Sequence, residues 1–163
     1  MKKTPFILLT LILSIALAAC GAPAADIPPS TQPPDAVVSF ADPVLEELVR
    51  GILGLPEGDI PLAQAQAVTR LDLGNHYRDY FQLETPITDL AGLEAFTSLE
   101  SLDLSGQAVM DLSPLAGLTR LTTLALGGNP VADVSPLVGL TSLKLLILSG
   151  SQAPDYGALA NLI

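Results

Sequence analysis

Cysteine, histidine and aromatic residues are scarce in this chain of 163 residues. It contains one cysteine, one histidine and no tryptophan, and aromatic residues make up 4% of it. A single cysteine cannot form a disulfide within the chain, so stability has to come from packing of the hydrophobic residues, which make up 49%. One histidine and one cysteine also fall short of the residue groups that build nucleophilic or zinc-dependent active sites. We therefore expect neither enzyme activity nor a cofactor.

Positive charge is scarce as well. Seven lysine and arginine residues stand against 17 aspartate and glutamate residues, which gives a formal net charge of −10. Nucleic acid is therefore excluded as the expected partner, because its phosphates are bound by basic side chains. The main apolar run, from Pro5 to Ala19, is too short for a typical membrane span. It follows Lys2 and Lys3 and ends in small residues, an arrangement typical of a secretory signal peptide, which we place at residues 1–19.

The end of this run, Leu17-Ala18-Ala19-Cys20, resembles the lipobox of bacterial lipoproteins. The resemblance implies cleavage before Cys20 and lipidation of its thiol, which would anchor the chain to the cell membrane or outer membrane, facing outside the cytoplasm. Gly21 directly follows the cysteine, and a glycine at this position resembles lipoproteins that are released to the outer membrane. The alternative role of Cys20 is a small buried hydrophobe. Cleavage would remove two lysines and leave five basic residues, a formal charge of −12.

Two segments are expected between the anchor and the repeats. Residues 20–41 contain five prolines and little periodicity, which favours an extended tether after the lipidated Cys20. Residues 42–67 are expected to form a helical N-terminal cap. Asp42 is suited to cap its helix and Pro43 to begin it, and apolar residues then recur at helical spacing until Gly54.

A 22-residue repeat governs the sequence from residue 68 onward. Leucines align in five columns when the chain is shifted by 22 positions: Leu99, Leu121 and Leu143; Leu102, Leu124 and Leu146; Leu104, Leu126 and Leu148; Leu115, Leu137 and Leu159; Leu118, Leu140 and Leu162. We divide this part into four units, residues 68–98, 99–120, 121–142 and 143–163. The first unit is longer than the others because it contains an insertion.

These units resemble the leucine-rich repeat family, in which LxxLxL forms a strand and the remainder returns over the opposite side. The period, the segments DLSPLAGL and DVSPLVGL, and the preceding helical segment are most similar to bacterial internalin-type proteins. The resemblance implies an α/β leucine-rich repeat solenoid, with a short parallel β-sheet on the concave face, loops and 3-10 turns on the convex face, and the N-terminal helical cap. One unit cannot bury its own leucines, so stacked units share a core.

Other columns mark the turns of each unit. A tight exit from the strand is permitted by the glycines at 106, 128 and 150. The family places a buried asparagine one position later, but only Asn129 of this chain matches, so we expect a weakened asparagine ladder. A column of aspartates recurs at 22-residue spacing, comprising Asp89, Asp111, Asp133 and Asp155. We interpret these aspartates as turn caps that accept backbone N–H bonds rather than as a metal ladder.

The outward positions of the strands are candidate ligand contacts, and they grade from charged to apolar along the units. They comprise Arg70, Asp72, Ser101, Asp103, Thr123, Leu145 and Ile147. Contiguous exposed apolar surface tends to mark contact sites, so the last two positions are the most informative. The alternative is that two surface hydrophobes have no function.

The insertion in the first unit comprises nine residues between Leu73 and Ile87, and it contains the sequence HYRDYFQLE. Its lone histidine has no partner at a useful spacing, which argues against catalysis. Its aromatic side chains, Tyr77, Tyr80 and Phe81, either contact a ligand or pack against the cap.

The sequence favours a membrane-anchored, extracytoplasmic leucine-rich repeat module that binds a protein or glycan without covalent chemistry. The alternative is a structural or truncated repeat fragment with no ligand of its own. No polar capping segment follows the last unit, so the edge of its strand is a candidate for self-association or for docking on a partner.

Overall fold

The computed structural model of the chain describes residues 36–75, 85–152 and 157–161, all of which belong to one compact unit, Gln32–Ile163. In chain order the elements are β1 (Val37–Val38), α1 (Pro43–Leu53), β2 (Ile60–Pro61), α2 (Leu62–Ala67), β3 (Arg70–Asp72), η1 (Leu93–Ala95), β4 (Ser101–Asp103), η2 (Ser113–Leu115), β5 (Thr123–Ala125), η3 (Ser135–Gly139), β6 (Leu145–Ile147) and η4 (Gly157–Asn161), where η denotes a 3-10 helix.

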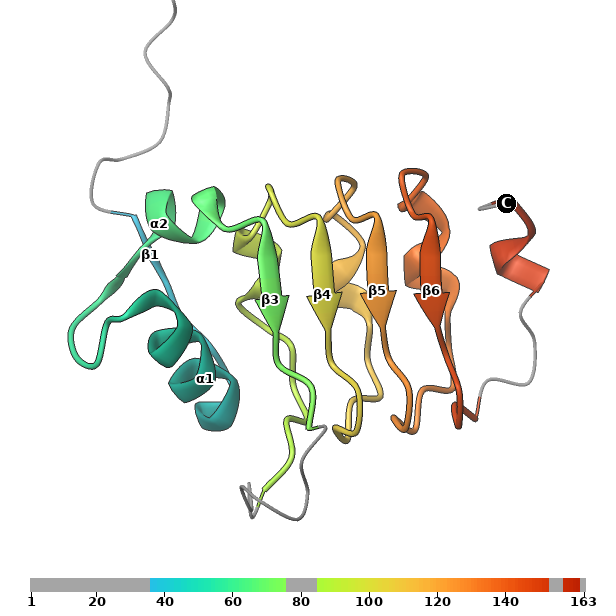
Figure 1. Cartoon of the computed structure of the whole chain (residues 1–163), viewed down its shortest axis with the longest axis horizontal. Coiled ribbons are helices and arrows are strands. Elements are labelled where there is room, and N and C mark those ends of the chain that lie inside the picture. Colours follow the sequence, from blue (N-terminus) through green and yellow to red (C-terminus); the bar gives the residue numbers. More distant parts are fainter. Residues whose placement is uncertain (1–35, 76–84, 153–156, 162–163) are drawn as a thin grey trace, which may run out of the picture. The chain divides into compact units, whose positions relative to one another are not determined.

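Four short strands form one parallel sheet in the order β3-β4-β5-β6 (Figure 1). The register pairs the same repeat position on every strand, so that the central residues in line are Leu71, Leu102, Leu124 and Leu146. Each repeat therefore advances the chain by one strand spacing of about 4.8 Å. The insertion between β3 and β4 does not shift this register. The predicted parallel sheet of a leucine-rich repeat solenoid is confirmed.

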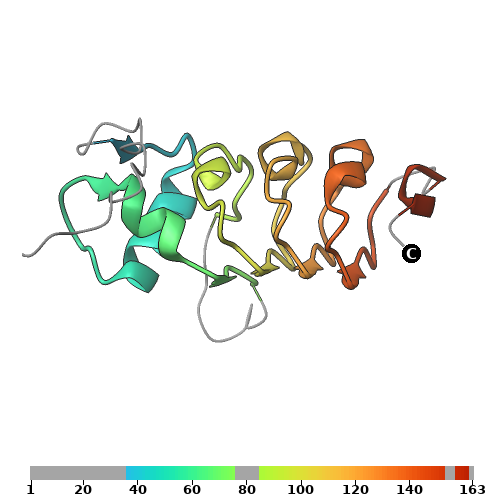
Figure 2. The ribbon, with the colours of Figure 1, turned by 90° about the horizontal axis from the view of Figure 1, so that it is seen from above.

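The 3-10 helices η1, η2 and η3 lie on the side of the chain opposite the sheet (Figure 2). In η2 and η3 a serine is the first residue and a proline the second, where a missing backbone N–H costs no helical hydrogen bond. The glycines at the strand exits have positive φ angles of 73° at Gly106, 74° at Gly128 and 79° at Gly150. These angles explain why glycine recurs in that column.

The core lies between the strands and the 3-10 helices. Leu102, Leu104, Leu124 and Leu126 point into it and are fully buried. The alternation of strand residues places the intervening side chains on the outer, concave face of the sheet.

Helix α1, before the sheet, adds two residues to the core. Asp42 accepts hydrogen bonds from the backbone N–H groups of Val44 and Leu45, and α1 ends at Gly54, whose φ is 68°. Leu45 and Val49, on the buried side of α1, belong to the same hydrophobic cluster as the repeat leucines. The predicted start of this helix and its capping residue are confirmed.

The segment expected to be a tether differs in part from the prediction. Val37–Val38 form β1, which pairs antiparallel with β2, although we assigned them to the tether that extends to residue 41. The folded part therefore begins before Asp42. Valine suits a strand, but two residues give no periodic signal, and their pairing partner lies beyond α1.

Candidate ligand-binding face

The candidate contacts form two rows across the concave face, because residues in register lie side by side on neighbouring strands. One row contains Arg70, Ser101, Thr123 and Leu145. The other contains Asp72, Asp103, Ala125 and Ile147. The structure therefore brings seven of the predicted site residues onto one surface.

The apolar end of this face is exposed. Leu145 and Ile147 of β6 are 51% and 40% exposed. On β5, Ala125 is buried. A Cβ atom added to Gly127, two residues after β5, would lie 2.9 Å from Oγ of Ser149 and 3.7 Å from Cγ2 of Ile147. Ile147 and Ala125 therefore form an apolar pair in register, whereas Leu145 lies beside Thr123.

The opposite end of the face carries charged side chains, and two of its carboxylates accept hydrogen bonds from the turns that follow their strands. Asp103 accepts a hydrogen bond from the N–H of Ser105 at 2.8 Å, and Asp72 accepts one from the N–H of Gly74 at 3.3 Å. These bonds orient the two carboxylates at the ends of β4 and β3. Glu100, just before β4, forms an exposed ion pair with Arg120 at 3.3 Å.

The aromatic candidates Tyr77, Tyr80 and Phe81 lie outside the described residues, as does Cys20. The residues on either side of the insertion are described, and the side chain of Gln107 is hydrogen-bonded to both of them. Its Oε1 accepts a hydrogen bond from the N–H of Ile87 at 2.9 Å, and its Nε2 donates one to the carbonyl of Leu73 at 2.6 Å. Gln107 therefore joins the residues on either side of the insertion.

Asn129 makes the same two kinds of bond one unit later. Its Oδ1 accepts from the N–H of Val109 at 3.0 Å, and its Nδ2 donates to the carbonyl of Leu104 at 2.8 Å. Both amide side chains are buried. The expectation that Gln107 weakens the ladder is wrong, because glutamine presents the same amide group on a side chain that is one methylene longer.

Asp42 has a second role that the sequence did not suggest. While Oδ1 caps α1, Oδ2 accepts hydrogen bonds from the N–H and hydroxyl of Thr88 at 2.8 and 3.1 Å and from the N–H of Asp89 at 3.3 Å. Burial alone would raise the pKa of this carboxyl, but the N–H donors of Thr88, Leu45, Asp89 and Val44 hold it below its ordinary value. One carboxylate thus ties the helix to the first repeat.

The structure describes three members of the aspartate column, and each of them caps a turn, as the sequence predicted. Asp89, Asp111 and Asp133 each accept the backbone N–H two residues later at 2.8 Å. Hydrogen bonds from Ser113 lower the pKa of Asp111, and bonds from Ser135 lower that of Asp133. Among the described residues, no three histidine, cysteine, aspartate or glutamate side chains lie close enough together to hold a metal ion.

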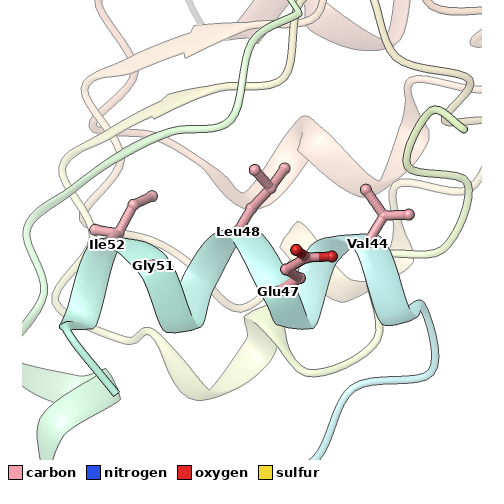
Figure 3. Close-up of a pocket in the computed structure, with 5 residues that line it drawn as sticks. All are labelled: Val44, Glu47, Leu48, Gly51 and Ile52. Carbon is pink, nitrogen blue, oxygen red and sulfur yellow. The ribbon is translucent and has the colours of Figure 1, made fainter. Parts of the chain in front are cut away.

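A shallow hollow of about 400 Å³ lies on one side of α1. Val44, Leu48 and Ile52 project into it one helical turn apart, and Gly51 leaves a gap beside them (Figure 3). Glu47 borders it. All five residues that line the hollow belong to α1, and none of them is a candidate contact.

Solved structures similar to this chain include internalins of Listeria monocytogenes. An internalin (inlF) matches with a TM-score of 0.68 and 31% identity over 76% of this chain and 34% of that chain. An internalin C2 (inlC2) matches with a TM-score of 0.67 and 32% identity over 76% of this chain and 51% of that chain. The chain therefore spans between a third and about half of the length of these two proteins, and it has an internalin-type leucine-rich repeat fold.

The functional domain of InlJ from the same organism, which includes a cysteine ladder, matches with a TM-score of 0.62 and 25% identity over 71% of this chain and 24% of that chain. The only cysteine of the present chain is Cys20, so the chain cannot form a cysteine ladder. No family model matches the sequence. No curated protein matches it either.

Proposed function

We propose that this chain is a membrane-anchored, extracytoplasmic module that binds another protein non-covalently through its concave face. The observation that carries the proposal is the exposure of Leu145 and Ile147 on that face, where Ile147 lies beside buried Ala125 and Leu145 beside Thr123. Apolar side chains left in contact with water on a sheet weaken solubility, and they tend to be kept where a partner covers them. The internalin-type fold supports a binding role, because its repeats present a continuous surface built from many strands.

The protein's anchoring is proposed from the sequence at Cys20. Leu17-Ala18-Ala19 before the cysteine and the apolar run before that support processing and lipidation. Two or more acyl chains bind a membrane stably, whereas one binds it only weakly. Among the described residues, no helix is both long enough and apolar enough to cross a bilayer.

Detergent phase separation of cells that express the full chain tests the anchor. The wild-type protein is expected in the detergent phase and a Cys20→Ser variant in the aqueous phase. Equal partition of the two proteins would overturn the anchor and leave the concave-face proposal standing.

Affinity capture from the native cell surface and its surroundings tests the concave face. A Leu145→Asp/Ile147→Asp variant is expected to lose the partner that the wild type recovers. The matched control is Met110→Asp/Val138→Asp, which changes two exposed apolar residues, 66% and 38% exposed, that lie outside the strands. Recovery of the same partner by the wild type and the concave-face variant would refute the proposal. If the captured partner were a glycan, the proposed kind of partner would be wrong, but the concave face would still be the binding surface.

Self-association is a second candidate, and the last strand favours it. Within the described part of the chain, β6 pairs with β5 alone, and Leu146 and Leu148 are only partly buried. An edge strand of this kind is a template for pairing with another chain. Light scattering of the purified chain, combined with amide exchange, tests it, since a monomer with slow exchange across residues 143–148 would exclude pairing at this edge.

A further inference from the structure

We propose that the hollow on α1 is a second binding surface, which takes a basic amphipathic helix of another protein. Val44, Leu48 and Ile52 contact the apolar residues of that helix, and Glu47 binds a lysine or arginine on it. None of these residues belongs to the concave face, so the inference goes beyond the proposed function. Its basis is an exposed glycine inside a helix, next to a row of apolar side chains and one acidic residue.

Gly51 is a glycine that the fold of the described residues does not require. Inside a helix, glycine is less favourable than alanine because it loses more backbone freedom on folding. Two other glycines have a structural reason, since Gly54 has a positive φ of 68° and a Cβ added to Gly92 would lie 2.6 Å from Cδ1 of Phe40. Gly51 has no positive φ, and a Cβ added to it would meet no atom of the described residues within 4 Å. A glycine at this position leaves room on α1 for the close approach of another chain.

The apolar side chains beside Gly51 form one row along α1 (Figure 3). Val44, Leu48 and Ile52 follow one another at intervals of four residues, so the row is about 12 Å long. Ile52 is 47% exposed, and Val44 and Leu48 are only partly buried. Rows of this spacing pack into the grooves on the surface of a second helix, and the missing side chain of Gly51 gives such a helix space. The expected occupant is therefore a helix with an apolar side.

Glu47 gives the hollow a negative edge. This residue is exposed, borders the hollow and lies one helical turn before Gly51. The arginine of the same helix, Arg50, donates hydrogen bonds of 2.9 and 2.7 Å to Glu46 instead. A lysine or arginine of the partner can therefore pair with Glu47, while its methylene groups lie over the apolar row.

Charge favours the basic helix over two other occupants. The formal charge of −10 attracts a basic segment before contact and repels an acidic one. A second copy of this chain would bring another Glu47 to the same surface, so the two negative edges would repel each other. Anionic lipid headgroups would be repelled in the same way.

Selection of phage-displayed helical peptides on the full-length chain in mild detergent tests the inference. Each peptide has an alanine-rich helical backbone with randomised residues on one side. The enriched peptides are expected to carry apolar residues four positions apart and a lysine or arginine three or four positions from one of them. Gly51→Leu, which fills the hollow, should lower their affinity at least tenfold. Glu47→Gln should lower it about threefold, as for other exposed ion pairs, and this loss should disappear at high salt.

Two matched variants leave the hollow unchanged. Gly117→Leu replaces another exposed glycine, whose added Cβ would also meet no atom of the described residues within 4 Å. Glu57→Gln removes an exposed carboxylate that does not border the hollow. Both variants should bind the peptides as the wild type does. Circular dichroism checks the fold of Gly51→Leu, and Ile52→Asp, with the same expected loss, replaces that variant if it does not fold.

Each of the other outcomes overturns the inference. Failure to enrich helical peptides, or equal binding to the wild type and Gly51→Leu, would remove the hollow as a binding surface. Peptides that need the hollow but lack basic residues would refute the basic partner. Self-association that Gly51→Leu abolishes would make a second copy the occupant. Binding of Cys20→Ser to phosphatidylglycerol vesicles, if Gly51→Leu abolished it, would make the occupant a membrane. The concave face is tested by its own variants, so its proposal stands or falls separately.

Discussion

The two ends of the parallel sheet bury equivalent leucines to different extents. At β3, Leu71 and Leu73 are 1% and 3% exposed, and the segment from α1 to α2 lies beside that strand (Figure 1). At β6, Leu146 and Leu148 occupy the same repeat positions but are only partly buried. The residue type is the same, so the difference comes from what covers each strand. Burial in this fold is a property of the stack rather than of the single unit.

The same comparison separates stability from binding. The covered end carries the carboxylate of Asp42 and the amide of Gln107, both buried and fully engaged with backbone groups. The less covered end carries apolar side chains that contribute little to the core. Substitutions should therefore divide into those that destabilise the fold and those that leave it stable while removing a contact surface.

Truncation of a central leucine should give the largest effect. Leu102→Ala is expected to lower the free energy of unfolding by about 3 kcal/mol, because a fully buried leucine loses its contacts and leaves a cavity. Leu146→Ala, at the equivalent position of β6, should cost only about 1 kcal/mol, since its side chain is already partly solvated. Urea unfolding of the two variants measures both values. Equal losses would show that β6 is covered as fully as β4.

Removal of a ladder amide should come next. Gln107→Leu leaves the N–H of Ile87 and the carbonyl of Leu73 without their partner in a buried place, and it is expected to cost about 2 kcal/mol. Asn129→Leu should cost a similar amount, since its bonds are equivalent. The control is Gln152→Leu, because Gln152 is exposed. A loss for Asn129 alone would mean that the glutamine is not part of the ladder.

Loss of the Asp42 charge should have a smaller and pH-dependent effect. Asp42→Asn puts an amide N–H₂ where a carboxylate oxygen accepts hydrogen bonds, so we expect a loss of about 1.5 kcal/mol at neutral pH. The pKa of Asp42 is below its ordinary value, so its stabilisation is present above an unfolded pKa of about 3.9 and is lost as the pH falls through the folded pKa.

Urea unfolding at a series of pH values from 7 to 3 measures this dependence. The wild type should lose stability more steeply than Asp42→Asn at the acidic end of the series. The matched control is Asp111→Asn, which removes an exposed turn cap whose pKa is also lowered, and its effect should be smaller. Parallel pH curves for the wild type and Asp42→Asn would mean that folding does not lower the pKa of Asp42.

Regular spacing made most of the fold predictable from the sequence. The 22-residue period predicts which leucines align on β4 to β6, and the structure places them in register. The helix start at Asp42 and the aspartate turns were also predictable, because such caps depend on residues two or three positions away. The concave positions follow from the alternation of strand residues.

The missed features all depend on partners distant in the sequence. Gln107 bonds to Leu73 and Ile87 across the insertion, and Asp42 bonds to Thr88, 46 positions away. Pairing of Val37–Val38 with β2 likewise spans α1. No local propensity encodes such contacts. The replacement of asparagine by glutamine at position 107 predicted a weaker ladder. The prediction failed because both side chains end in the same amide group.

Substitution of the exposed apolar pair should have the smallest effect on stability. Leu145→Ser/Ile147→Ser is expected to change the free energy of unfolding by no more than about 0.5 kcal/mol, because surface substitutions away from packed or bonded groups seldom exceed that amount. Leu124→Ser is the matched control on β5, and it should unfold the chain at a much lower urea concentration, since Leu124 is fully buried. Leu145 and Ile147 can serve binding rather than stability only if their substitution leaves the free energy of unfolding nearly unchanged. A loss of 2 kcal/mol or more would instead identify Leu145 and Ile147 as part of the core, and the concave face would lose its apolar contact surface.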